Sequence, residues 1–135
     1  SKDNEDYDFS GKRILLTEDN ELNQEIAIEL LSTTGVFIDV ADNGSIGVDM
    51  FTSKPEGYYD LIFMDIQMPV MTGYDATIAI RASGHPDAKK IPIIAMTANA
   101  FSTDVRAAFE AGMNGHISKP IDMEVVLKTM KKHIS

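Results

Sequence analysis

Five short strand-like runs, each followed by a segment with helical periodicity, limit the folds open to this chain more than any other feature. They are ILL at 14–16, VFIDVA at 36–41, LIFM at 61–64, IPIIAM at 91–96 and GHIS at 115–118. Short continuous apolar runs are typical of strands buried on both faces, and helices of about 10–15 residues join such strands by right-handed crossovers. The pattern predicts a doubly wound α/β fold with a five-stranded parallel sheet, strand order 2-1-3-4-5, and five helices, the flavodoxin-like arrangement.

Capping residues and apolar stripes mark the helices between these runs. Asn20 can cap a helix that ends before Gly35, and Asn43-Gly44 predicts a turn before the next helix. The first helix is expected to bury one stripe made of Leu22, Ile26, Ala27, Leu30 and Leu31. The last helix is expected to bury Met123, Val126, Leu127, Met130 and Ile134.

The first residues of the chain differ in character from the rest. Residues 1–11 are polar and acidic and are interpreted as a linker, with ordered structure beginning near Arg13, so the folded domain is expected to span 12–135. The length suits a single domain. Because the chain does not begin with Met, we expect it to be either an excised fragment of a longer protein or a processed chain.

Composition excludes several functions. A net charge of −9 argues against direct binding to nucleic acid or to an anionic membrane, which needs a surplus of Lys and Arg. The absence of cysteine excludes disulfides, Cys-zinc sites and Cys nucleophiles, and fits a reducing compartment. No apolar run approaches the roughly 20 residues of a membrane span, and the polar start is unlike a signal peptide.

Polar residues stand just beyond each of the expected central strands. Glu18 and Asp19 follow the first run, Asp65 follows the third, Thr97 the fourth and Lys119 the fifth. In a doubly wound sheet the carboxyl ends of the strands form the ligand-binding edge. The sequence therefore predicts that these five residues share one pocket.

Three carboxylates and one ammonium suggest a particular chemistry. Carboxylates without His or Cys suit Mg²⁺, with Mn²⁺ as a substitute, better than zinc. With the cation bound, the pocket could accept a phosphoryl group held by Lys119 and Thr97, and an Asp carboxylate can take that group covalently. Taken alone, the residues also have ordinary structural explanations. Glu18 and Asp19 could be acids at a helix start, Asp65 a loop acid and Lys119 part of a common loop dipeptide, and Thr97 by itself is uninformative.

Three other functions stay open at this point. A Mg²⁺-dependent phosphatase with Asp65 as nucleophile usually needs a second Asp at position 67, which is Gln. A flavin carrier needs a phosphate-binding loop after the first strand, where the chain has TEDNE. The third is a module that only binds partners, and the complete set of Asp65, Thr97 and Lys119 argues against it.

Four segments resemble the receiver domains of two-component phosphorelay systems. They are RILLTEDN at 13–20, DLIFMDIQMPVMTG at 60–73, IPIIAMTANAF at 91–101 and AGMNGHISKPI at 111–121, so the resemblance covers nearly the whole chain. The Glu18-Asp19-Asn20 opening and the MDIQMPVM and MTANAF runs are most similar to receivers of hybrid sensor histidine kinases. A stand-alone single-domain response regulator is the alternative.

The resemblance implies a role for each site residue. Asp65 would be the phosphoacceptor, and Asp19, Glu18 and the backbone carbonyl of Gln67 would hold Mg²⁺ with it. Thr97 and Lys119 would bind the phosphoryl group. Lys119-Pro120 would be a cis peptide that orients the lysine. The domain would catalyse its own phosphorylation and dephosphorylation, and the full protein would be a histidine kinase if it is a hybrid.

The resemblance also implies partners and a place in the cell. The donor or acceptor would be a phosphohistidine domain of a kinase or a histidine phosphotransfer domain. The domain would work in the cytoplasm, on the cytosolic side of the membrane in a hybrid sensor kinase.

Three residues are expected to modulate the switch. His116 stands three residues before Lys119, where many receivers carry a Tyr or Phe that turns inward when the threonine moves. A surface His on an edge strand is the alternative interpretation. Gln67 and Asn99, two residues beyond Asp65 and Thr97, are expected to steer the water that hydrolyses the acyl phosphate.

Overall fold

The computed structural model describes residues 7–98 and 102–134. The strands are β1 (Arg13–Thr17), β2 (Phe37–Ala41), β3 (Leu61–Asp65), β4 (Ile93–Thr97) and β5 (Gly115–Ser118). The helices are α2 (Glu21–Leu31), the 3-10 turn η1 (Ser32–Thr34), α3 (Gly44–Ser53), α4 (Gly73–Arg81), α5 (Ser102–Ala111) and α6 (Met123–Ile134). None of the helices in these ranges is both long and apolar enough to cross a bilayer.

The five strands form one parallel sheet in the order β2-β1-β3-β4-β5. This confirms the predicted fold class and strand order. The continuous apolar runs are the central strands: every residue of β3 and of β4 is buried, whereas the edge strand β2 is mostly half-buried. Burial on both faces explains why these strands lack the alternation of polar and apolar residues seen in half-buried sheets.

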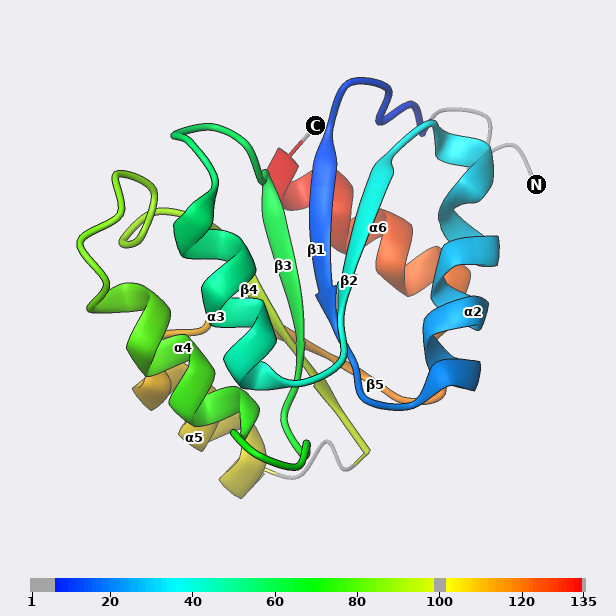
Figure 1. Ribbon diagram of the computed structural model, residues 1–135. Helices are drawn as coiled ribbons and strands as arrows, with labels where there is room; N and C mark the ends of the chain where they lie inside the picture. Colours follow the sequence, from blue (N-terminus) through cyan, green and yellow to red (C-terminus); the bar gives the residue numbers. More distant parts are fainter. Residues whose placement is uncertain (1–6, 99–101, 135) are drawn as a thin grey trace.

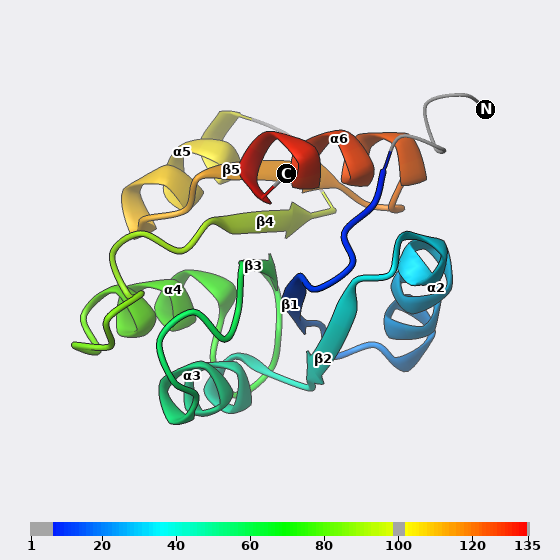
Figure 2. The same ribbon diagram turned by 90° about the horizontal axis from the view of Figure 1, so that it is seen from above.

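Helices cover both faces of the sheet. α3, α4 and α5 pack on one face and α2 and α6 on the other (Figures 1 and 2). Leu15, Ile62 and Met64 point into the layer with α3, α4 and α5, while Ile14, Leu16 and Phe63 point into the layer with α2 and α6. Successive strand residues thus feed opposite core layers, as the geometry of a pleated strand requires.

Side-chain caps fix where three helices begin. Asn20 accepts a hydrogen bond from the backbone N–H of Asn23 at 3.0 Å, as predicted for α2. Asn43 caps α3 in the same way, through the N–H of Ile46 at 2.9 Å, so Asn43-Gly44 is a helix start rather than a separate turn. Thr72 caps α4 at the end of the loop that follows β3. The caps at Asn20 and Thr72 begin helices at the edge where the strands end.

The predicted apolar stripe of α2 is only partly correct. Ala27 and Leu31 are buried, but Leu22 is 64% exposed and Ile26 is 39% exposed. Residues 22, 26 and 30 and residues 27 and 31 lie on adjacent faces of the helix, about 100° apart. The sequence does not show which of two neighbouring stripes meets the sheet, and the structure turns the second one inward.

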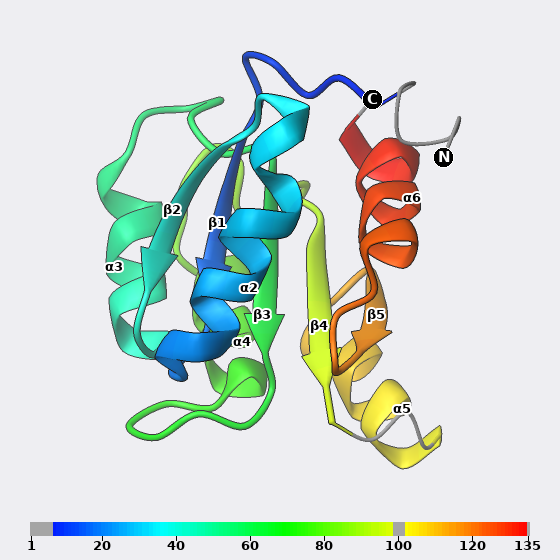
Figure 3. The same ribbon diagram turned by 90° about the vertical axis from the view of Figure 1, so that its right-hand side faces the viewer.

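Packing begins earlier than the expected linker boundary. Phe9 is 2% exposed and lies in the core layer of α2 and α6, and its N–H donates to the carbonyl of Thr34 at 2.8 Å. The segment from residue 7 and the end of α6 lie at the same edge, where the strands start (Figure 3). The packed structure thus begins before Arg13, where the sequence predicts its start. One aromatic residue, Phe9, is enough to anchor this acidic stretch to the core.

Candidate functional site

The carboxyl ends of β1, β3, β4 and β5 bring together the polar residues singled out in the sequence. Across the sheet, Thr17 pairs with Met64, Asp65 with Met96, and Thr97 with Ser118, so the strands end nearly level. Glu18 and Lys119 are the next residues beyond β1 and β5. The structure thus places Glu18, Asp19, Asp65, Gln67, Thr97 and Lys119 in the lining of one pocket.

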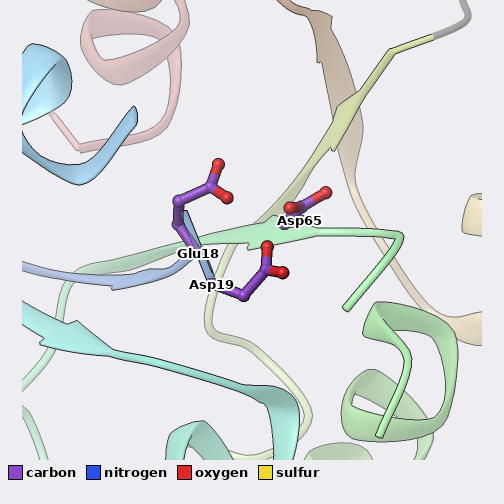
Figure 4. A group of neighbouring side chains, drawn as sticks. All are labelled: Glu18, Asp19 and Asp65. Carbon is purple, nitrogen blue, oxygen red and sulfur yellow. The ribbon is translucent and has the colours of Figure 1, made fainter. Parts of the chain in front are cut away.

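Three carboxylates lie around one small space at the base of this pocket. Figure 4 shows Glu18 and Asp19 from the segment after β1 and Asp65 from the end of β3. One carboxylate oxygen from each lies within 4.8 Å of those of the other two. Glu18 and Asp65 are 1% and 4% exposed, whereas Asp19 is exposed. Hard oxygen ligands at this spacing, with one side open to water, fit a Mg²⁺ ion that keeps several of its own waters.

Lys119 joins two of these acids. Its Nζ lies 2.7 Å from Oε1 of Glu18 and 2.9 Å from Oδ2 of Asp65. Burial alone would lower the pKa of the Lys119 ammonium, but its close contacts with the carboxylates of Glu18 and Asp65 outweigh burial, and the net pKa is raised. The lysine therefore stays charged and compensates part of the negative charge that the fold has buried.

The backbone around Lys119 holds it in place. Its N–H donates to the carbonyl of Thr97 at 2.8 Å, which continues the pairing of β4 and β5 by one residue. The Lys119-Pro120 peptide is cis, as the resemblance implied. From this position the side chain of Lys119 reaches the carboxylate of Asp65.

Asn20, the N-cap of α2, and Gln24 in its first turn fix the position of Glu18. The N–H of Asn20 donates to Oε2 of Glu18 at 3.1 Å, and Nε2 of Gln24 donates to the Glu18 carbonyl at 2.6 Å. The same Gln24 nitrogen also donates to Asp42 Oδ1 at 3.0 Å, in the segment after β2. Glu18 is thus held from its side chain and its main chain, which allows a carboxylate to be buried in a defined orientation.

The loop between β3 and α4 is closed tightly beside Asp65. The N–H of Gly73 donates to the Ile66 carbonyl at 2.9 Å, and the N–H of Gln67 donates to Asp65 Oδ1 at 3.2 Å. Met68 is buried and anchors the loop to the core layer of α3 and α4. Gln67 itself is exposed at the rim of the pocket.

The residues expected to bind or sense the phosphoryl group lie on β4 and β5. Thr97 is buried at the end of β4 and lines the pocket. His116 is exposed on the edge strand β5, opposite Ala95. Asn99, the other residue expected to steer water, lies outside the described residues.

Three contributors to the pocket were not singled out from the sequence. Gln24 supports Glu18, and Asn23 and Asp104 line the pocket itself. For Asn23 and Gln24 a signal was available, because they lie one helical turn after Asn20 and so face the same way. Asp104 comes from the first turn of α5, and nothing in its local sequence separates it from an acid that only favours a helix start.

Comparison with known proteins identifies the family. The sequence pattern of the family described as "Response regulator receiver domain" matches residues 14–131. Probable histidine kinase 2 of rice is 35% identical over 96% of this chain, and hybrid signal transduction histidine kinase B of Dictyostelium discoideum is 39% identical over 92%. The chain spans only 13% and 7% of these two relatives.

Two solved structures are similar over most of their length. One is the receiver domain of the sensor histidine kinase PA1611 of Pseudomonas aeruginosa, with magnesium coordinated in its active-site cleft: 34% identity, TM-score 0.82, covering 93% of this chain and 98% of that one. The other is the receiver domain of the Saccharomyces cerevisiae response regulator Ssk1 in a complex with the histidine phosphotransfer protein Ypd1: 30% identity, TM-score 0.80, covering 93% and 90%.

Proposed function

The chain belongs to the family of response regulator receiver domains, and we propose that Asp65 is the residue that accepts the phosphoryl group. The observation that carries the proposal is the environment of this one carboxylate. Asp65 is 4% exposed, yet it opens into the pocket at the sheet edge, with a lysine ammonium 2.9 Å from Oδ2 and two further acids beside it. A carboxylate that contacts an ammonium and faces the pocket is placed to act as a nucleophile toward a bound substrate.

The transfer itself is a displacement at phosphorus. An oxygen of Asp65 forms a P–O bond while the P–N bond of a phosphohistidine breaks, and the imidazole, protonated on its other nitrogen, leaves as the neutral ring. The Lys119 ammonium stabilises the negative charge that develops on the phosphoryl oxygens, and the Thr97 hydroxyl donates a hydrogen bond to one of them. Hydrolysis of the acyl phosphate by water, steered by Gln67 and Asn99, restores the carboxylate and releases inorganic phosphate.

A divalent cation belongs to this site in our proposal. Glu18, Asp19, Asp65 and the backbone carbonyl of Gln67 would hold Mg²⁺, with Mn²⁺ as a substitute. Bound there, the ion would neutralise charge on the phosphoryl oxygens during transfer. The family relation, the magnesium in the PA1611 receiver and the spacing of the three carboxylates support this assignment.

The partner is proposed to be a phosphohistidine domain of a kinase or a histidine phosphotransfer domain. Leu22 and Ile26 are exposed on α2, and Ile26, Pro120 and Ile121 line an apolar groove that also reaches Lys119. Docking on this groove would bring a phosphohistidine to the mouth of the pocket. The complex of the Ssk1 receiver with Ypd1 supports a partner of this kind.

We further propose that residues 12–135 are the receiver of a hybrid sensor histidine kinase, on the cytosolic side of the membrane. The similarity to histidine kinases that are many times longer, one of them a hybrid kinase, supports this over a stand-alone regulator. In the switch, movement of Thr97 would shift the surface formed by α5, β5 and α6, with His116 on that surface as the responding side chain.

Intact mass after incubation with a phosphodonor tests the assignment. Wild type with Mg²⁺ should gain one phosphoryl group that hydroxylamine removes, and Asp65→Asn should gain none. Asp60→Asn is the matched control, because Asp60 lies at the opposite edge of the sheet, where it accepts from the N–H of Arg13. Failure of both small donors and a phosphohistidine protein to label wild type would refute the proposal.

A further inference from the structure

A fourth carboxylate, that of Asp104, lines the pocket from α5. The first three acids follow β1 and β3, whereas Asp104 lies in the first turn of the helix that comes after β4. It belongs to none of the segments expected to form the metal site or to bind the phosphoryl group. The pocket therefore carries one acid that the proposed chemistry does not use.

A helix start explains why an acid is favourable at this position, but not why it faces the pocket. Thr103, Arg106, Ala107 and Glu110 line a separate recess on another side of α5. An acid at position 103 would meet the helix N-terminus equally well and would face that recess. The charge of Asp104 also reaches α4: the pKa of Tyr74 is raised, mainly by burial and further by Asp104.

The formal charge of the pocket depends on this residue. Four carboxylates and the ammonium of Lys119 leave a net charge of −3, which a bound divalent cation reduces to −1. Without Asp104 the same cation would leave the pocket neutral. A phosphodonor with two negative charges therefore approaches a pocket that is still negative after the cation has bound.

We propose that Asp104 sets the donor specificity of the receiver: its charge strengthens cation binding and repels small anionic phosphodonors. The inference rests on the proposed function of Asp65. A phosphohistidine on a docked protein overcomes the same repulsion with binding energy from the apolar groove beside α2, whereas a free acyl phosphate has no such contact. Asp104 thus slows phosphorylation of Asp65 by small anionic metabolites. Transfer from a docked protein partner is then favoured over transfer from these small donors.

Two small donors of different charge separate an electrostatic effect from a structural one. Acetyl phosphate is a dianion: its acyl P–O bond breaks, acetate leaves, and an Asp65 oxygen takes the phosphoryl group. Phosphoramidate carries one net negative charge at neutral pH: its P–N bond breaks, and ammonia leaves with the protons already on nitrogen. Repulsion by Asp104 acts about twice as strongly on the first donor.

The experiment compares wild type, Asp104→Asn, Asp104→Glu and Glu110→Gln. Glu110→Gln removes the same charge from the same helix but on the side of the other recess. Labelling rates are measured by intact mass at saturating Mg²⁺, with each donor, at low and high salt. Mg²⁺ affinity is measured separately by following amide resonances in a titration without any donor.

Asp104→Asn should change the two measurements in opposite directions. Labelling by acetyl phosphate should become about threefold faster and labelling by phosphoramidate less than twofold faster, and high salt should remove most of the gain. Mg²⁺ affinity should fall about twofold to threefold. Asp104→Glu should behave like wild type, and Glu110→Gln should change neither rate nor affinity.

The outcomes separate this inference from the proposed function. Equal changes with both donors, changes that ignore salt, or an unaltered Mg²⁺ affinity in Asp104→Asn would overturn the role of Asp104 even if Asp65 is labelled normally. If no donor labels wild type, the role of Asp65 fails instead. The Mg²⁺ titration then still decides whether Asp104 contributes to the field of the pocket.

Discussion

Gly73, the first residue of α4, lies in direct contact with the backbone carbonyl of Asp65. A β-carbon at position 73 would overlap the Asp65 carbonyl oxygen and press on the Cα of Ile66. The helix that follows the site thus begins against the backbone of the residue proposed to accept the phosphoryl group. Any side chain at position 73 would have to displace either α4 or the end of β3.

We therefore expect Gly73→Ala to lower the free energy of unfolding by about 3 kcal/mol, because backbone atoms cannot move aside as a flexible side chain can. Labelling of Asp65 should fall more than the loss of folded protein explains. Gly115→Ala is the control, because its β-carbon would make only an ordinary contact of 3.4 Å with Ile94. Urea unfolding and intact mass measure the two effects, and equal stabilities of the two variants would contradict the expectation.

Arg81 at the end of α4 is predicted to be a major source of stability. Its guanidinium donates twice to the Gly112 carbonyl, at 3.0 and 2.8 Å, and once each to those of Ala88 and Ile91. Arg81→Met would leave these carbonyls without their donor and should cost about 3 kcal/mol in urea unfolding. Arg106→Met, on the exposed side of α5, should cost less than 1 kcal/mol. Similar losses in both variants would refute this role.

The central strands β1, β3 and β4 could be predicted from the sequence because they are buried on both faces. An unbroken apolar run such as that at 61–64 fits few positions other than a buried strand, and parallel topology then follows from the helices between the runs. The burial of α2 could not be predicted in the same way. Leu22 and Leu31 are equally apolar, and only the packing of α2 on the sheet buries one and exposes the other.

The site was predictable to the extent that it depends on strand ends. Glu18, Asp65 and Lys119 each stand at the carboxyl end of a recognisable strand, so the topology alone brings them together. Asp104 reaches the site from α5, and its orientation depends on how that helix is rotated about its axis. A single sequence contains no comparably direct signal for that rotation.

Phe9 is predicted to belong to the folded domain, although it stands within the acidic segment expected to be a linker. Phe9→Ala should lower the free energy of unfolding by about 3–4 kcal/mol, as expected for a fully buried aromatic side chain. Phe9→Leu should recover most of this loss. Tyr7→Ala should cost clearly less, because Tyr7 is only half-buried. If Phe9→Ala unfolds at the same urea concentration as wild type, packing of this segment does not stabilise the domain in solution.

Tyr59 is expected to make the domain sensitive to alkaline pH. Its hydroxyl donates to Asp39 Oδ2 at 2.7 Å; burial first, and this hydrogen bond second, raise the pKa of Tyr59 above its usual value of 10. The unfolded chain releases the Tyr59 proton near pH 10 while the folded chain retains it, so the free energy of unfolding falls as pH rises above 10. The raised pKa of Lys119 acts in the same direction above about 10.5.

Tyr59→Phe removes the Tyr59 contribution and leaves that of Lys119. The variant should be about 1 kcal/mol less stable than wild type at pH 8, because Asp39 loses a hydrogen bond. Between pH 10 and 11 it should lose stability less steeply than wild type, by at most about 1.4 kcal/mol for each pH unit. The two curves should therefore converge toward pH 11 in urea titrations. Curves that stay parallel from pH 8 to 11 would show that the Tyr59 proton does not contribute to the alkaline loss of stability.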